Sequence, residues 1–217
     1  MNESSPKISG TLFVGIFLII LTVIVGLAEL KLSRERARPP LPVIGPVADF
    51  SLTNQAGRAA SLEDLRGKVW VADIIFTRCP GPCPRMTRQM RELQDALPTG
   101  STTHLVTLTT DADYDTPPVL LKYAQKYGAD PARWTFLTGD KRDVAHLAID
   151  SLKLTAIAKP PAERTSDVDL FVHSTIFVVV DKQARLRMTY ETGGDNVDWQ
   201  QSKSAILDAV SQLENEP

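Results

Sequence analysis

The sequence predicts an α/β domain in which a central mixed sheet is flanked by helices, preceded by one N-terminal transmembrane helix. Apolar, strand-like runs alternate with helix-like segments, and the only two cysteines directly follow the first long apolar run. Residues 8–28 contain no charged side chain. Overall, 43% of the 217 residues are hydrophobic and the formal net charge is −2, so the basic excess typical of a nucleic-acid-binding protein is absent.

The N-terminal apolar segment is long enough to cross a membrane. At about 1.5 Å per residue, a helix over residues 8–28 would span the ~30 Å hydrocarbon core. We therefore expect a tail at 1–7 and an uncleaved anchor at 8–30. A cleavable signal peptide is the alternative, but no Ala-x-Ala site follows the run. A lipid anchor is excluded, because no cysteine lies at the end of this segment.

The charges beside the anchor do not fix its orientation. Lys7 is the only basic residue before the span, whereas four basic residues follow it, at positions 31, 34, 36 and 38. The positive-inside rule would keep the domain in the cytoplasm, although a large folded domain can cross despite its charges. A proline-rich linker at 31–46 then leads to a single domain at 47–217.

The domain begins with a predicted hairpin, since residues 49–52 precede the turn Gln55-Ala56-Gly57-Arg58. The nearly continuous apolar run at 69–76 predicts a strand covered on both faces. Further elements are expected in this order: a helix over 85–97, a strand over 103–109, a helix over 115–127, a short strand over 134–137, a helix over 143–151, an irregular segment over 155–169, paired strands over 174–180 and 184–190, and an amphipathic helix over 198–213.

The two cysteines lie in Cys79-Pro80-Gly81-Pro82-Cys83-Pro84, where a strand turns into a helix. Two sulfurs at such a junction make either a metal clamp or a redox pair, and the pair makes the fold thioredoxin-like. Pro84 fits the first helical turn, so the helix should begin beside Cys83. This helix start and the arginines at 78, 85 and 88 favour thiolate over thiol. A disulfide is also geometrically possible, though a staple across so short a loop stabilises little.

A two-thiolate site suits Cu(I), and a nearby imidazole would complete a trigonal set. Of the three histidines, His104 is expected within a strand and His146 on a helix face, where structural or exposed roles are usual. His173 stands where the irregular segment enters the strand over 174–180, which should neighbour the strand over 69–76. The loop could bring this imidazole over the cysteines, but the pattern alone does not decide between a ligand and an ordinary side chain.

Three motifs occur in a fixed order along the chain. They are Thr77-Arg78-Cys79-Pro80-Gly81-Pro82-Cys83-Pro84, Asp111-Ala112-Asp113-Tyr114-Asp115-Thr116-Pro117 and Val172-His173-Ser174-Thr175. Together they resemble the Sco/SenC family of membrane-anchored copper chaperones for cytochrome c oxidase, and the resemblance covers about residues 47–215. It implies a thioredoxin-like domain on the periplasmic side of the inner membrane, held by a single span.

The resemblance also implies the site and its partners. Copper, as Cu(I) or Cu(II), would be bound by Cys79, Cys83 and His173 and passed to the copper-site subunit of the oxidase, which holds a dinuclear copper site. A periplasmic copper donor and a thiol reductant are further expected partners, and nucleic acid is not. Two departures stand out, because family members usually carry acidic residues where this chain has Gly81 and Val172. Their loss lowers the negative charge around the metal.

An enzymatic alternative uses the same cysteines without a lasting metal. A thiol–disulfide oxidoreductase would attack with Cys79 and resolve the mixed disulfide with Cys83, thereby reducing the copper-ligand cysteines of the oxidase. A peroxidase fits less well, because it needs one activated cysteine rather than a proline-flanked pair. The metallochaperone is the favoured reading, and the histidine at 173 discriminates, since only the metal site needs it.

Five further residues invite a functional interpretation. Asp73 lies in an otherwise apolar strand, and a buried carboxylate must be paired or protonated; it could accept a proton from a thiol or form a structural salt bridge. Met86 and Met90 share a helical stripe with Leu93 and Leu97, which predicts a core role rather than copper ligation. Asp115 is expected to cap the helix that follows, and Asp111 could reach the metal region.

Overall fold

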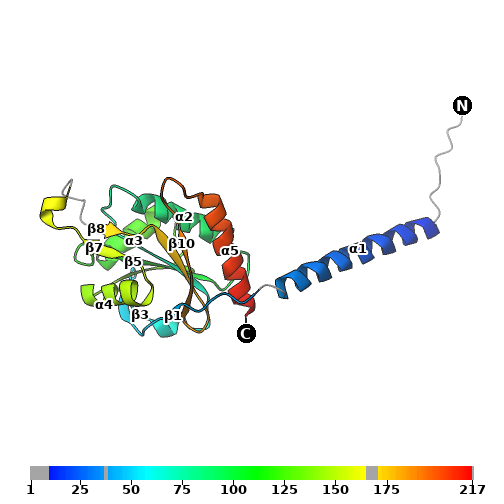
Figure 1. The fold of residues 1–217 in the computed structure, drawn as a ribbon, viewed down its shortest axis with the longest axis horizontal. Coiled ribbons are helices and arrows are strands. Elements are labelled where there is room, and N and C mark those ends of the chain that lie inside the picture. Colours follow the sequence, from blue (N-terminus) through cyan, green and yellow to red (C-terminus); the bar gives the residue numbers. More distant parts are fainter. Residues whose placement is uncertain (1–9, 37–38, 165–170, 217) are drawn as a thin grey trace, which may run out of the picture. The chain divides into compact units, whose positions relative to one another are not determined.

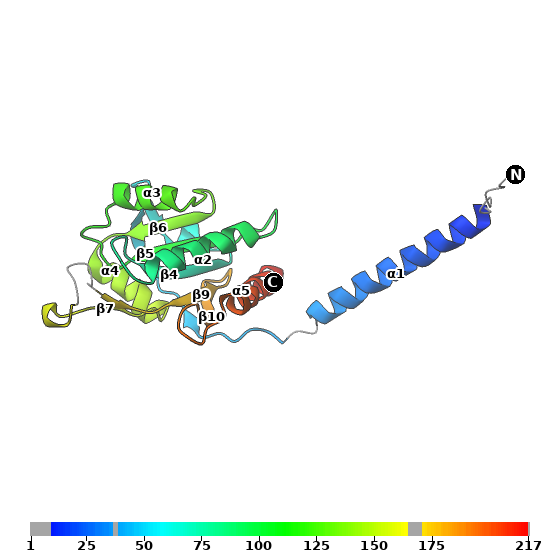
Figure 2. The same ribbon diagram turned by 90° about the horizontal axis from the view of Figure 1, so that it is seen from above.

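The computed structural model describes residues 10–36, 39–164 and 171–216 (Figures 1 and 2). The chain divides into two compact units, Met1–Pro40 and Leu41–Pro217. In the first unit, α1 (Gly10–Arg36) is one continuous helix. Its window Phe13–Leu30 has a mean hydropathy of 2.7, and none of it is buried inside the protein. By length and composition, α1 is therefore a candidate membrane span, as the sequence predicts.

Eight strands of the described second unit form one mixed sheet. They are β1 (Gly45–Pro46), β2 (Ser51–Asn54), β3 (Ala59–Ser61), β4 (Trp70–Ile75), β5 (His104–Thr109), β6 (Trp134–Thr138), β9 (Ile176–Val180) and β10 (Arg185–Glu191). Their order is β1-β10-β9-β4-β5-β6-β2-β3. The neighbours β4, β5 and β6 are parallel, and the other pairings are antiparallel. The predicted mixed sheet is confirmed, and β2 and β3 form the hairpin expected from residues 49–52 and the turn at 55–58.

Helices cover both faces of this sheet, which explains why every residue of β4 is buried (Figure 2). One face packs against α2 (Cys83–Ala96), α3 (Pro117–Lys126) and α5 (Trp199–Asn215). The other packs against α4 (Lys141–Ala145), the helix η2 (His146–Ser151) that continues it, and the short helix η1 (Leu62–Asp64). Alternate residues of β4 therefore enter two separate cores, and the cysteines belong to the core beneath α2.

A second, two-stranded sheet precedes β9. It consists of β7 (Ala156–Ala158) and β8 (Phe171–His173), paired antiparallel so that Ala156 faces His173, with the short helix η3 (Pro161–Glu163) in the connection. The expectation of an irregular segment over 155–169 is therefore wrong at its start, while residues 165–170 lie outside the described part. Three-residue strands escape sequence analysis, because their pairing is specified by distant residues rather than by a local period.

The helix predicted over 143–151 begins earlier and changes its winding. Asp140 caps α4, since its carboxylate accepts a hydrogen bond from the backbone amide of Arg142 at 2.8 Å. From His146 onward the helix is a π-helix, closed by a bond from the amide of Leu152 to the carbonyl of Leu147. This wider turn brings Leu147 and Leu152, five residues apart, to the same buried side.

The start of the second unit is fastened by Arg187 of β10. Its guanidinium donates to the backbone carbonyls of Leu41 and Pro42 and pairs with the carboxylates of Asp181 and Glu216. Burying a charged guanidinium is costly, and these carboxylates and carbonyls offset the cost by accepting its hydrogen bonds. The network joins the beginning and the end of the compact unit through one side chain.

Candidate metal centre

The cysteines occupy the junction between β4 and α2, as predicted. Strand β4 ends at Ile75, and α2 begins at Cys83, with Pro84 in its first turn. Proline is favoured there because the first helical amides have no partner within the helix. Both sulfurs are therefore held by a proline-restricted loop at the carboxyl end of a central parallel strand.

Both cysteines are thiols outside any disulfide, and both are buried. Cys79 is 8% exposed and Cys83 is 1% exposed. A hydrogen bond joins the two thiol side chains. The backbone amide of Gly81 donates to the sulfur of Cys79 at 3.4 Å, and that of Phe76 donates to the sulfur of Cys83 at 3.5 Å. The loop thus places two sulfurs side by side, with one amide donor directed at each.

Burial raises the pKa of the Cys83 thiol far above its ordinary value. The hydrogen bond with Cys79 and the nearby charge of Asp73 act in the same direction, and the amide of Phe76 opposes them. The expectation that the helix start and the arginines favour a thiolate is therefore wrong for Cys83. Loss of hydration outweighs the helix dipole, and the side chains of Arg85 and Arg88 are exposed to solvent.

The loop after β5 lies beside the cysteine loop, because the carboxyl ends of neighbouring parallel strands meet at one edge of the sheet. The buried carboxylate of Asp115 accepts hydrogen bonds from the backbone amide of Thr77 at 3.0 Å and from the hydroxyls of Thr77 and Thr109. The pKa of Asp115 is raised above its ordinary value, because the effect of burial is larger than the opposing effect of these hydrogen bonds. The prediction that Asp115 caps α3 is wrong, since Thr116 occupies the cap position.

Arg78, the residue before Cys79, is held by the same loop. Its guanidinium pairs with the carboxylate of Asp111, with an Nη2–Oδ2 distance of 2.5 Å, and lies 4.0 Å from the centre of the Tyr114 ring. Cation–π contact and ion pairing together fix the direction of this side chain. Asp111 is thus engaged with Arg78, so Thr77 and Arg78, which follow the end of β4, are both bonded to the loop after β5.

The backbone of His173 lies at the same edge of the sheet. Strand β9 runs antiparallel to β4, with Val178 opposite Ala72, so β9 begins where β4 ends. His173 closes β8, three residues before β9 begins. Its side chain lies outside the described part of the structure. Among the side chains that are described, no three of the His, Cys, Asp and Glu type form a group that could hold a metal ion.

Comparison with known proteins decides the family. Residues 44–206 match the SCO1/SenC family model. The chain belongs to the SCO1/SenC family. The SCO1 protein homolog of Bacillus subtilis is 32% identical over 170 residues, which cover 77% of this chain and 84% of that protein. The resemblance drawn from the three sequence motifs is thereby confirmed.

Solved structures of Sco proteins share the fold. BsSco, described as a member of the Sco family of cytochrome c oxidase assembly proteins with a disulfide switch, superposes with a TM-score of 0.64 at 29% identity, covering 81% of this chain and 99% of that one. ScoI of Bradyrhizobium japonicum, solved with copper bound, gives a TM-score of 0.60 at 22% identity, covering 75% and 97%. The predicted thioredoxin-like fold is confirmed.

The remaining candidate residues of this SCO1/SenC chain lie in different environments, some in the core and one at the surface. Met86 and Met90 are fully buried in the core under α2, as predicted. His146 is exposed and its ring lies 3.9 Å from the carboxylate of Asp150. Asp73 is buried on the α2 side of β4, where it accepts a hydrogen bond at 2.7 Å from the hydroxyl of Thr107. Sequence analysis missed Thr107, although a threonine inside an apolar strand is a visible signal.

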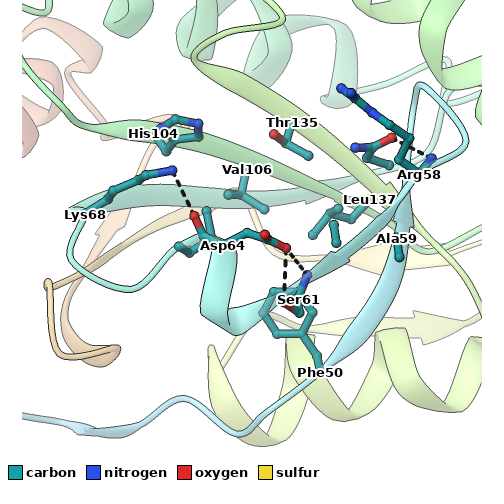
Figure 3. A pocket seen from close by; sticks show the side chains of 13 residues that line it. Phe50, Arg58, Ala59, Ser61, Asp64, Lys68, His104, Val106, Thr135 and Leu137 are labelled. Carbon is teal, nitrogen blue, oxygen red and sulfur yellow. Dashed lines mark hydrogen bonds between the residues drawn. The ribbon is translucent and has the colours of Figure 1, made fainter.

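His104 belongs to a different region of the domain. It lines a cavity of about 340 Å³ together with Lys68, Arg58 and Phe50 (Figure 3). The apolar floor of this cavity belongs to the core on the α4 side of the sheet, whereas the thiols lie in the core on the α2 side. Burial lowers the pKa of His104. Because this cavity and the sulfurs lie on opposite faces of the sheet, His104 is remote from the sulfurs. This agrees with the sequence-based expectation that His104 is a structural strand residue.

We expect Cys83 to be poorly reactive. In a Cys79→Ser variant, burial continues to oppose thiolate formation, so iodoacetamide at pH 8 should modify Cys83 at least about tenfold more slowly than it modifies an exposed cysteine. Mass spectrometry over time measures the rate, and the same variant unfolded in urea supplies the reference. Equal rates in the folded and unfolded protein would contradict the burial of this thiol.

Replacing Asp115 should destabilise the domain. Asp115→Ala leaves the amide of Thr77 and two hydroxyls without their acceptor, which should lower the free energy of unfolding by about 3 kcal/mol. Asp113→Ala is the matched control on the same loop, because Asp113 is exposed and pairs only with the exposed Lys141 among the ion pairs of the described residues. Urea denaturation of residues 41–217 measures both. Similar losses for the two variants would refute the role assigned to Asp115.

Proposed function

We propose that this SCO1/SenC protein is a copper metallochaperone. Cys79, Cys83 and His173 bind one copper ion and deliver it to the dinuclear copper site of cytochrome c oxidase. The observation that carries the proposal is the pair of adjacent thiols at the sheet edge where the segment bearing His173 enters β9. Two sulfurs and an imidazole form a donor set that copper prefers to the hard cations.

The environment of the sulfurs is suited to holding such an ion. The proline-restricted loop keeps both sulfurs adjacent before binding, so little conformational freedom is lost when the ion arrives. The amides of Phe76 and Gly81 donate toward the sulfurs and would stabilise the thiolates that bind the metal. Because the thiol of Cys83 has a raised pKa, binding displaces a proton from it. Sco relatives solved with copper bound agree with this choice of cargo.

Delivery would proceed by exchange of ligands with the recipient. Cys79 is the more exposed of the two cysteines, so an incoming thiolate would reach the ion from that side while Cys83 stays bound beneath α2. Gly81 itself adds no side chain that could block this approach. The recipient is the copper-site subunit of the oxidase, and a periplasmic copper donor would load the site.

The proposed arrangement in the cell starts from α1, which is a candidate membrane span by length and composition. Residues 8–30 form a single membrane anchor after a short tail at 1–7, and residues 31–46 link it to a copper-binding domain at 47–217 on the periplasmic side of the inner membrane. In that oxidising compartment the adjacent thiols need a reductant. The alternative, an oxidoreductase that reduces the oxidase's cysteines, uses Cys79 and Cys83 but does not require an imidazole.

Anaerobic copper titration separates these functions. The reduced protein should bind one Cu(I) per chain, and His173→Ala should weaken binding by more than the 10- to 100-fold loss typical of an outer-shell partner. The rate of disulfide exchange with glutathione should change less than about twofold, since exchange needs only the cysteines. His146→Ala is the control, because its ring is exposed and lies near Asp150 of its own helix. Equal copper affinity of the wild type and His173→Ala would reject the ligand assignment.

A reporter fused after residue 217 tests the topology. Alkaline phosphatase, which needs export to form its disulfides, should be active in this fusion, whereas a reporter that works only in the cytoplasm should be silent. A fusion after residue 7 supplies the opposite orientation as a control. Activity of only the cytoplasmic reporter after residue 217 would eliminate the role in oxidase assembly.

A further inference from the structure

We propose that Gln89 is a positioning residue for the segment that carries His173, acting through Thr192. This inference deepens the proposed function and rests on it. Cys83 and His173 are ninety positions apart in the chain, so a three-ligand site requires that their two segments be held in a fixed relation. The structure shows a hydrogen-bonded path between them.

The path begins on α2, the helix that starts at Cys83. Gln89 lies on this helix and is 4% exposed. Its side-chain amide donates to the backbone carbonyl of Thr192 at 2.8 Å. Thr192 follows the end of β10 and is 2% exposed. A buried side chain of the cysteine-bearing helix is thus bonded to the backbone of the chain segment between β10 and α5.

The path continues from Thr192 to Thr175, two residues after His173. Both the backbone amide and the hydroxyl of Thr192 donate to the carbonyl of Thr175, at 2.7 and 2.9 Å. In return, the hydroxyl of Thr175 donates to the carbonyl of Gly193 at 3.1 Å. Three hydrogen bonds therefore fix residues 192–193 against the strand entry next to His173.

Gly193, the residue after Thr192, also lies between α2 and the segment that leads from His173 into β9. A methyl group at this position would overlap the guanidinium of Arg85 on α2 and would come within 3.0 Å of the Cβ atom of Thr175. Gly193 is therefore packed between the cysteine-bearing helix and the histidine-bearing segment. Arg85 and Gln89, four residues apart on one helix, contact the same two-residue link.

The surroundings of Gln89 suggest that a polar side chain is kept at this position for function rather than for stability. This glutamine lies next to Met90 in a helix whose other buried side chains, apart from the hydroxyl of Thr87 and the thiol of Cys83, are apolar. Within the described residues, its side-chain oxygen is buried without a hydrogen-bond partner. A buried amide whose oxygen accepts no hydrogen bond makes the folded protein less stable than an apolar side chain of the same shape would. Stability alone would favour methionine here, whereas the bond to Thr192 favours glutamine.

The test compares copper affinities in the full-length protein, reduced and held in detergent, with Cu(I) as the probe and a Cu(I) chelator as competitor. Gln89→Met removes the donor and keeps the shape, and it should weaken Cu(I) binding about 10- to 100-fold. Gln94→Met is the matched control on the same helix, because Gln94 bonds to the loop at 128–130 instead. It should bind Cu(I) like the wild type, and neither substitution should change the rate of disulfide exchange.

A double-mutant cycle with His173→Ala identifies what Gln89 acts upon. If Gln89 acts through the histidine segment, Gln89→Met should cause no further loss of Cu(I) affinity once the imidazole is gone. An undiminished loss in the His173→Ala background would overturn the proposal, and so would equal affinities of Gln89→Met and Gln94→Met. Thr192→Val, which removes one hydroxyl and keeps the fold's shape, repeats the cycle if Gln89→Met does not fold. Absence of Cu(I) binding by the wild type would instead reject the metal site itself.

Discussion

The antiparallel pairing of β9 with β4 is the constraint on which the site depends. The parallel neighbours β4 and β5 bring two loops to one edge of the sheet, but parallel strands alone deliver only their carboxyl ends to that edge. Because β9 runs the other way, its amino end arrives there too, together with the β7–β8 hairpin that precedes it. Three distant parts of the sequence therefore meet at the strand–helix junction that holds the sulfurs.

Polar groups gather beneath this edge where an ordinary core would be apolar. Asp73 and Thr107 lie on neighbouring strands under α2, and the indole of Trp134 donates to the same threonine hydroxyl. Each buried polar atom needs a partner to be tolerated, so these groups specify their neighbours in a way that apolar side chains do not. The domain thus departs from simple apolar packing beneath this edge, as it also does at the buried Arg187 network.

Features with a local cause could be predicted from the sequence, and features with a distant cause could not. The start of α2 follows from Pro84, and the burial of Met86 and Met90 follows from their helical spacing. Asp115 was misassigned because Thr116 and Pro117 form an equally good local signal, and only the fold shows that its carboxylate reaches Thr77. The protonation of Cys83 escaped prediction for the same reason, since the helix start is visible in the sequence but the depth of burial is not.

The pairing of Arg78 with Asp111 has an electrostatic consequence for any positively charged cargo. A lone guanidinium next to Cys79 would repel an approaching cation, and its field would fall off slowly with distance. Bound to a carboxylate, the same group forms a dipole whose field decays much faster, and the Tyr114 ring shields its face. The residue next to Cys79 therefore presents a neutral ion pair rather than a lone positive charge, in a chain whose Gly81 and Val172 supply no acid of their own. A cation bound by the proposed site would thus meet little repulsion from Arg78.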